Sequence, residues 1–157
     1  MSVGRMSAVA AALALLPTAA IAEEWGSAPD GSAAIAQGAA QLNIVCDTKH
    51  GRALHSDSLG KILIFVIEPR ANWTKLAKVE VKTMADDGPP ATSQSSEGIA
   101  LTPTSLVIED DATWELSEIG SAKKTFTIRT GAFSRTYSAL RLKEAVAPVL
   151  EKCGDHW

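Results

Sequence analysis

The strongest signal for the fold is the run KILIFVIE at residues 61–68. It is rich in β-branched and aromatic side chains, and it ends at Pro69. A strand with one exposed face alternates between apolar and polar residues, whereas an apolar run of this length is typical of a strand covered on both faces. We therefore predict that residues 61–68 form a central strand with both faces covered.

Other segments around this run also have strand patterns. The apolar and polar residues alternate with a period of two, or the composition favours a strand, at residues 41–46, 76–84, 104–109, 125–130 and 133–140. Gly131 separates the last two segments, which predicts a hairpin. The polar residues 91–97 are either a short edge strand or a loop. Most neighbouring strands are expected to be antiparallel, because no strand–helix–strand alternation is present.

A helix is predicted near the end of the chain. Apolar residues recur there at helical spacing, at Leu142, Ala145, Val146, Val149, Leu150 and Cys153. Pro148 lies inside this helix and predicts a kink, and Gly154 ends it. Residues 111–124 fit either a short helix capped by Asp111 or a strand. The pattern as a whole predicts a β-rich α+β fold, with a small antiparallel β-sandwich or curled sheet and the C-terminal helix packed on it.

The first 22 residues have the features of a secretory signal peptide. Arg5 provides a positive charge, residues 6–16 (MSAVAAALALL) form a short apolar run, and small residues end at Ala22. This run is shorter than a transmembrane helix, and no later segment approaches that length. We expect a periplasmic or secreted protein with no stable membrane insertion once the signal is removed.

The remaining chain is predicted to contain one domain. Residues 23–40 are rich in alanine, glycine and serine, and we expect a flexible N-terminal arm that lies loosely over the domain. A short helix over residues 32–40 is the alternative. Residues 41–157 are then a single β-rich domain, which is long enough to bury its own core.

The two cysteines, Cys46 and Cys153, are expected to form one disulfide, because an exported chain folds in an oxidising compartment. Chain-entropy arithmetic for a loop of this length gives about 4–5 kcal/mol of stabilisation. Two alternatives remain at this point. One is a zinc site in which His50 and His156 complete a Cys2His2 set, and the other is a pair of free thiols.

No motif in the sequence names a reaction. His55, Ser56 and Asp57 are adjacent, so their side chains point in different directions and cannot form a catalytic relay. The acidic groups at residues 86–87 and 109–111 would bind calcium only if the fold brought them together, and solvated turns are the simpler interpretation. We therefore expect no catalytic, cofactor-binding or metal-binding residues, no cofactor, and a protein that is not an enzyme.

Charge and aromatic content suggest a class of partner. The chain has 15 basic and 18 acidic residues without a basic cluster, which argues against nucleic acid as a partner. Trp25, Trp73 and Trp114 are candidates for an interaction surface, or else they anchor loops to the core. We expect a module that binds another envelope or secreted protein. The alternatives are a periplasmic hydrolase or hydrolase inhibitor, and a carrier of a small ligand.

Residues 126–154 resemble the end of a known family. They comprise a strand, a turn, a strand containing Tyr137 and Ser138, and the helix ALRLKEAVAPVLEKCG. This arrangement is similar to that of bacterial periplasmic type VI secretion-associated (VasI-like) proteins. In those proteins a strand leads into a leucine-rich helix with a central proline and a late cysteine. Arg141 stands near the position of the glycine that usually precedes the helix. The resemblance implies a bacterial envelope protein with a β-rich fold and no known catalysis.

Overall fold

The computed structural model describes residues 24–49, 60–86, 88, 95–155 and 157. The predicted signal peptide lies outside these ranges, as do His50, the stretch from His55 to Asp57, and His156. Within these ranges, nine strands form a single antiparallel sheet in the order β1-β2-β3-β4-β7-β6-β5-β8-β9. The strands are β1 (Gly26–Ser27), β2 (Ala33–Gln37), β3 (Ala40–Asp47), β4 (Lys61–Ile67), β5 (Lys78–Ala85), β6 (Ser96–Thr102), β7 (Ser105–Ile108), β8 (Thr125–Thr130) and β9 (Phe133–Ser138).

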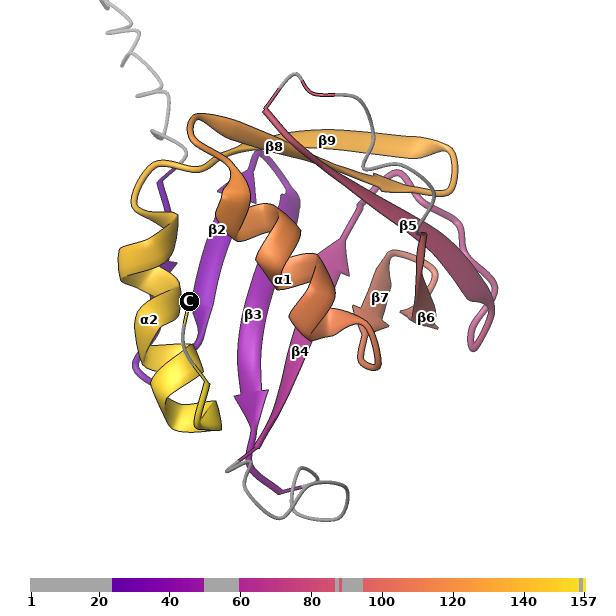
Figure 1. The fold of residues 1–157 in the computed structure, drawn as a ribbon. Helices are drawn as coiled ribbons and strands as arrows, with labels where there is room; N and C mark the ends of the chain where they lie inside the picture. The colour runs from indigo at the N-terminus through magenta and orange to yellow at the C-terminus, as the bar shows by residue number, and fades with distance from the viewer. Residues whose placement is uncertain (1–23, 50–59, 87, 89–94, 156) are drawn as a thin grey trace, which may run out of the picture.

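The sheet curls into a half-barrel, and the two helices of the described chain lie on its concave side (Figure 1). Helix α1 (Ala112–Ser121) packs against β5 and β4, whereas α2 (Leu142–Cys153) packs mainly against β3. The predicted β-rich fold with a curled antiparallel sheet and a C-terminal helix is thus confirmed. The open question at residues 111–124 is answered by a helix that begins after Asp111.

Helix α2 follows its apolar pattern, since all six residues at helical spacing are buried. The helix continues through Pro148, which is exposed. Arg141 precedes the helix with a φ of 61°, in the left-handed region that favours glycine. The helix ends at Gly154, whose φ of 70° also lies in that region.

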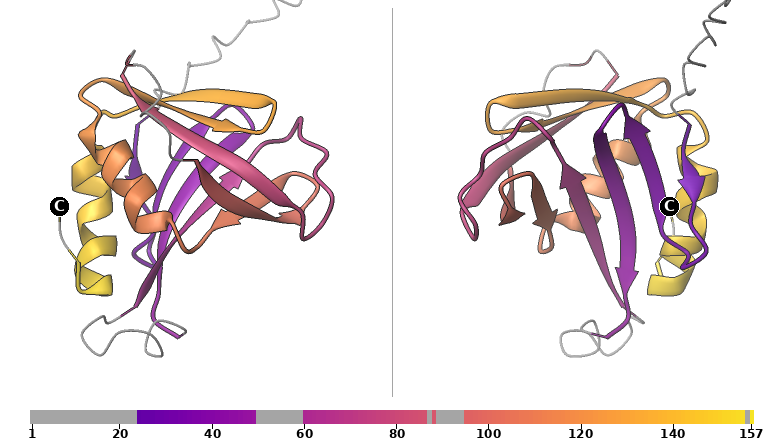
Figure 2. Two further views of the ribbon diagram at one scale, coloured as in Figure 1. Left: turned by 45° about the vertical axis from the view of Figure 1, so that its right-hand side comes forward. Right: turned by 180° about the vertical axis from the view of Figure 1, so that it is seen from behind.

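Strand β4 is an interior strand, as predicted, because β3 and β7 pair with its two edges. Its inward side chains, Ile62, Ile64 and Val66, are buried in the core between sheet and helices. The expectation that both of its faces are covered is wrong, since its outward side chains stay half-buried. In this sheet the helices cover only the concave face (Figure 2).

Strand β6 was missed by the sequence pattern, which left residues 91–97 as an edge strand or a loop. Ser96 and Glu97 pair with β5, and from Gly98 onward the strand lies between β5 and β7 in the interior of the sheet. The pattern is weak because residues 91–97 are mostly small and polar. A Cβ atom at Gly98 would lie 2.7 Å from Leu106 Cδ1, so a larger residue there would force the buried Leu106 side chain to shift.

The N-terminal segment forms strands, and this corrects the expectation of a loose arm or a short helix over residues 32–40. Strand β2 pairs with β3 from Ala33, opposite Ile44, to Gln37, opposite Ala40. Ala33 and Ile35 alternate into the core, so pairing and burial override the weak strand preference of alanine. The small side chains leave no strong sequence signal, although the segment completes one end of the sheet.

The half-barrel is held together where β9 meets the N-terminal strands. The indole Nε1 of Trp25 donates a hydrogen bond of 2.9 Å to the carbonyl of Ser138 in β9. The amide Nε2 of Gln37 donates one of 3.0 Å to the carbonyl of Thr136. The Trp25 ring also stacks on Phe126, with centroids 6.1 Å apart. The two ends of the sheet are therefore joined through side chains, since β2 and β9 are not paired strands.

Cys46 of β3 and Cys153 of α2 form the predicted disulfide, with their Cα atoms 5.6 Å apart. The zinc and free-thiol alternatives are therefore wrong, because both sulfurs bond to each other. Gly60 lies beside the bridge. A Cβ atom there would be 2.6 Å from Cys46 Sγ and 3.0 Å from the Asp47 carbonyl oxygen, so the chain enters β4 with no side chain against the disulfide.

We predict that replacing both cysteines by serine lowers the free energy of unfolding by up to about 4–5 kcal/mol, because the 107-residue separation makes the loop costly to close. Urea titration of the oxidised wild type and the double variant measures the difference. Reduced wild-type protein is the matched control and should behave like the variant. Equal midpoints for the oxidised and reduced proteins would contradict the prediction.

A buried carboxyl group lies between α1 and the sheet. Glu115 is fully buried and faces Thr83 and Ser96, which hydrogen-bond it. Its Oε1 atom has no hydrogen-bond partner in the described residues. Burial raises the pKa of Glu115 above its usual value of 4.5, although the hydrogen bonds from Ser96 and Thr83 act in the opposite direction.

We predict that Glu115→Gln stabilises the protein at neutral pH by on the order of 1 kcal/mol, because it removes the charge that burial disfavours and keeps an acceptor oxygen for Thr83. The folded protein binds this proton more tightly than the unfolded chain does. Stability should therefore fall as pH rises above about 4.5 and level off beyond the raised pKa. Thermal melts from pH 4 to 8 test this, with Glu118→Gln on the same helix as the control. A variant whose stability follows the wild-type pH profile would exclude this effect.

Candidate functional site

The three tryptophans singled out in the sequence do not form one surface. Trp25 is 3% exposed and belongs to the core, so its side chain offers no contact area to a partner. Trp73 is partly buried in the segment between β4 and β5, and Trp114 is partly buried on α1. Trp25 and Trp73 also pack on the core cluster, which matches the anchoring alternative for these two.

The outer face of the sheet carries a row of apolar side chains. Phe65 of β4 lies opposite Val107 of β7, and Val107 lies opposite Ile99 of β6. Along β4, Leu63 and Ile67 flank Phe65 on the same face, because side chains alternate along a strand. We call this group the outer strip; its members are Val45, Leu63, Phe65, Ile67, Ile99 and Val107.

The outer strip is separate from the core. The core cluster contains the inward residues of β4 and β7, such as Ile64, Leu106 and Ile108, but none of the outer strip. Seen from behind, β3 and β4 lie in front of α1, and α2 stands at the edge of the sheet (Figure 2, right). Most of the strip is half-buried, and only Val107 is 3% exposed, because Phe65 and Ile99 flank it across the sheet.

Charged and polar residues border the outer strip. On β5, Lys78 lies opposite Ile99, and its Nζ atom is 2.8 Å from Glu97 Oε1. This ion pair raises the pKa of Lys78. Lys61 pairs with Glu109 and Asp110 at the far end of β4. Protein-binding surfaces often have an apolar centre with a polar border of this kind.

The sequence pattern assigned Leu63, Phe65 and Ile67 to a strand covered on both faces, and it left Ile99 outside every predicted element. A continuous apolar run is more typical of a strand covered on both faces, but it does not by itself fix how many faces are covered. The neighbouring segments carried a signal for the exposed face. Most of the other predicted strands alternate, which is typical of an antiparallel sheet with one solvated face. In such a sheet, an apolar run at residues 61–68 leaves apolar side chains on the outside.

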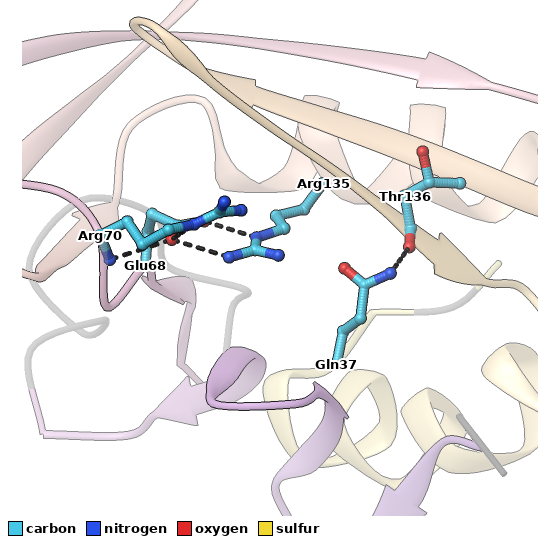
Figure 3. A network of polar contacts seen from close by, with 5 residues as sticks. All are labelled: Gln37, Glu68, Arg70, Arg135 and Thr136. Carbon is cyan, nitrogen blue, oxygen red and sulfur yellow. Dashed lines mark hydrogen bonds and ion pairs between the residues drawn. The ribbon is translucent and has the colours of Figure 1, made fainter. Parts of the chain in front are cut away.

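A polar cluster lies at the end of β4, where the chain turns under β9 (Figure 3). Glu68 is 1% exposed, and Arg135 of β9 donates two hydrogen bonds to its carboxylate, of 2.6 and 2.9 Å. The backbone N–H of Arg70 donates a third, of 3.1 Å. The Arg135 guanidinium holds the pKa of Glu68 below its usual range. This ion pair is a second link between β9 and the other half of the sheet.

We predict that Glu68→Gln destabilises the protein by about 2–3 kcal/mol at pH 7, because a largely buried bidentate pair loses one charge. The folded-state pKa of Glu68 is lowered, so its contribution is present above about pH 4.5 and is lost as pH falls through the lowered value. Urea unfolding at pH 7 and pH 3 measures the change. Glu97→Gln, in an exposed pair, is the control and should cost less than about 1 kcal/mol.

Three of the acidic residues considered for calcium are engaged in other contacts, and Asp87 lies outside the described residues. Asp86 accepts hydrogen bonds from the backbone N–H groups of Lys123 and Lys124, and these lower its pKa. Glu109 and Asp110 pair with Lys61. Among the described residues, no group of three histidine, cysteine, aspartate or glutamate side chains is placed to hold a metal ion.

Comparisons with known proteins found no matching family model, no matching curated protein and no matching solved structure. In the part of the chain that the structure describes, neither helix has the length and apolar character to cross a membrane.

Proposed function

We propose that this chain is an exported, non-enzymatic module that binds another envelope or secreted protein through the outer strip. The observation that carries the proposal is the apolar row across β4, β7 and β6, which has a charged border and no helix on its side within the described residues. Apolar surface patches with a polar border often mark sites where another protein binds.

Two further features support export. The disulfide suits a chain that folds in an oxidising compartment. The first 22 residues have the composition of a signal peptide. The resemblance of residues 126–154 to VasI-like proteins points to the bacterial envelope. Arg141, near the glycine position of that pattern, adopts the backbone conformation that glycine favours. The hydrolase, inhibitor and ligand-carrier hypotheses stay predictions.

We predict that Phe65→Asp abolishes capture of the partner, because a charge is placed in the apolar centre of the strip. The disulfide-bonded protein is immobilised and exposed to an envelope extract, and the bound proteins are identified by mass spectrometry. Ser134→Asp is the matched control, because it adds the same charge to an exposed position on the outer side of β9.

Thermal melts must first show that both variants fold, and Phe65→Thr replaces Phe65→Asp if the latter does not. A protein that is captured by wild type and Ser134→Asp, but not by the Phe65 variant, supports the proposal. Equal capture by all three forms, or capture of nothing by wild type, contradicts it.

A further inference from the structure

A second surface lies away from the centre of the outer strip, between the segment that follows β4 and the β8–β9 hairpin. It is an open groove of about 530 Å³. Its aromatic wall is formed by Trp73 and Phe133, whose ring centroids are 6.4 Å apart in an edge-to-face arrangement at 86°. Arg70 and Asn72 lie on the same side as Trp73, and the hairpin turn at Gly131 and Ala132 lies next to Phe133. We call this surface the Trp73 groove.

The backbone of the Trp73 groove is held in place from several sides. The N–H of Trp73 donates to the Pro103 carbonyl at 2.9 Å, and the N–H of Gly131 donates to the Glu80 carbonyl at 3.0 Å. These bonds tie the two walls to neighbouring strands. A groove whose walls are already ordered loses less entropy on binding than one that must form around its ligand.

The charge at one end of the Trp73 groove is unbalanced. The carboxylate of Glu68 lies near two guanidinium groups. Arg135 donates hydrogen bonds to both of its oxygens (Figure 3). Arg70 Nε approaches the same carboxylate only at 3.6 Å, and the Arg70 side chain is 69% exposed. One negative charge thus faces two positive charges, and the surplus lies on Arg70.

The other charges of the groove are matched locally. Lys78 pairs with Glu97 at 2.8 Å, and Glu80 pairs with Lys82 at 3.2 Å. The surplus at Arg70 therefore defines the electrostatic character of the groove. A guanidinium beside aromatic rings fits a carboxylate attached to an apolar group, because the carboxylate pairs with Arg70 while the apolar group packs on Trp73 and Phe133.

We propose that the Trp73 groove binds a short peptide segment that carries a carboxylate next to an apolar side chain. The carboxylate belongs either to a free chain end or to an acidic side chain, and both use the same contact with Arg70. The groove shares Lys78 with the border of the outer strip, but the residues that would contact the peptide, Arg70, Trp73 and Phe133, lie outside the strip, so the failure of one proposal leaves the other standing.

The test titrates the disulfide-bonded protein with three tripeptides and follows the indole N–H of Trp73 and the amide of Gly131 by two-dimensional NMR. The first is acetyl-glycyl-leucyl-phenylalanine with a free carboxylate, and the second is its C-terminal amide. The third is acetyl-glycyl-aspartyl-phenylalanine amide, whose only carboxylate is on a side chain. We expect the free acid, the side-chain acid or both to shift these signals, and the neutral amide to bind at least tenfold more weakly.

The variants are Arg70→Gln and Lys75→Gln. Both remove one exposed positive charge from the same segment, but Lys75 does not line the groove. Arg70→Gln should weaken binding roughly ten- to hundredfold, the scale of a charge-assisted hydrogen bond, and Lys75→Gln should leave it unchanged. Equal binding of acid and amide, equal loss in both variants, or no shift with any peptide overturns the proposal. Shifts of these signals by N-acetylglucosamine but not by the peptides also overturn it.

Discussion

The contact between α2 and β3 is the constraint on which the rest of the structure depends, and the Cys46–Cys153 disulfide makes it covalent. An antiparallel sheet of this length must bury one face, and the helices provide that cover. Helix α2 comes from the end of the chain and β3 from near its start, so the contact closes almost the whole described chain into one loop. The bridge restricts the unfolded chain and holds the helix over the concave face.

The covering of only one face has a direct consequence for function. Strand β4 is apolar on both sides, yet the two helices of the described chain occupy only one of them. Phe65 and its neighbours in the outer strip therefore lie on the outer face, where adjacent side chains partly cover one another from solvent. The same constraint that stabilises the inside of the half-barrel creates an apolar surface on the outside.

The curl of the sheet also explains the polar cluster and the Trp73 groove. Because the sheet bends, β9 crosses near the ends of β2 and β4 without pairing with them (Figure 1). Side chains bridge the junction: Gln37 and Trp25 bond to the backbone of β9, and Glu68 pairs with Arg135. The turn before β9 then stands next to the segment after β4, and the groove lies between them.

Much of the fold is determined by the sequence alone. Alternating side chains identify β3, β5 and β8, the turn at Gly131 predicts β9, and helical spacing identifies α2. The two cysteines predict their own pairing. These signals depend on local periodicity and chemistry. Only the tertiary structure decides the role of the alanine-rich N-terminal segment, the burial of Trp25 and the exposure of the outer strip. Periodicity tells which residues share a face, but whether that face is covered depends on elements contributed by distant parts of the chain.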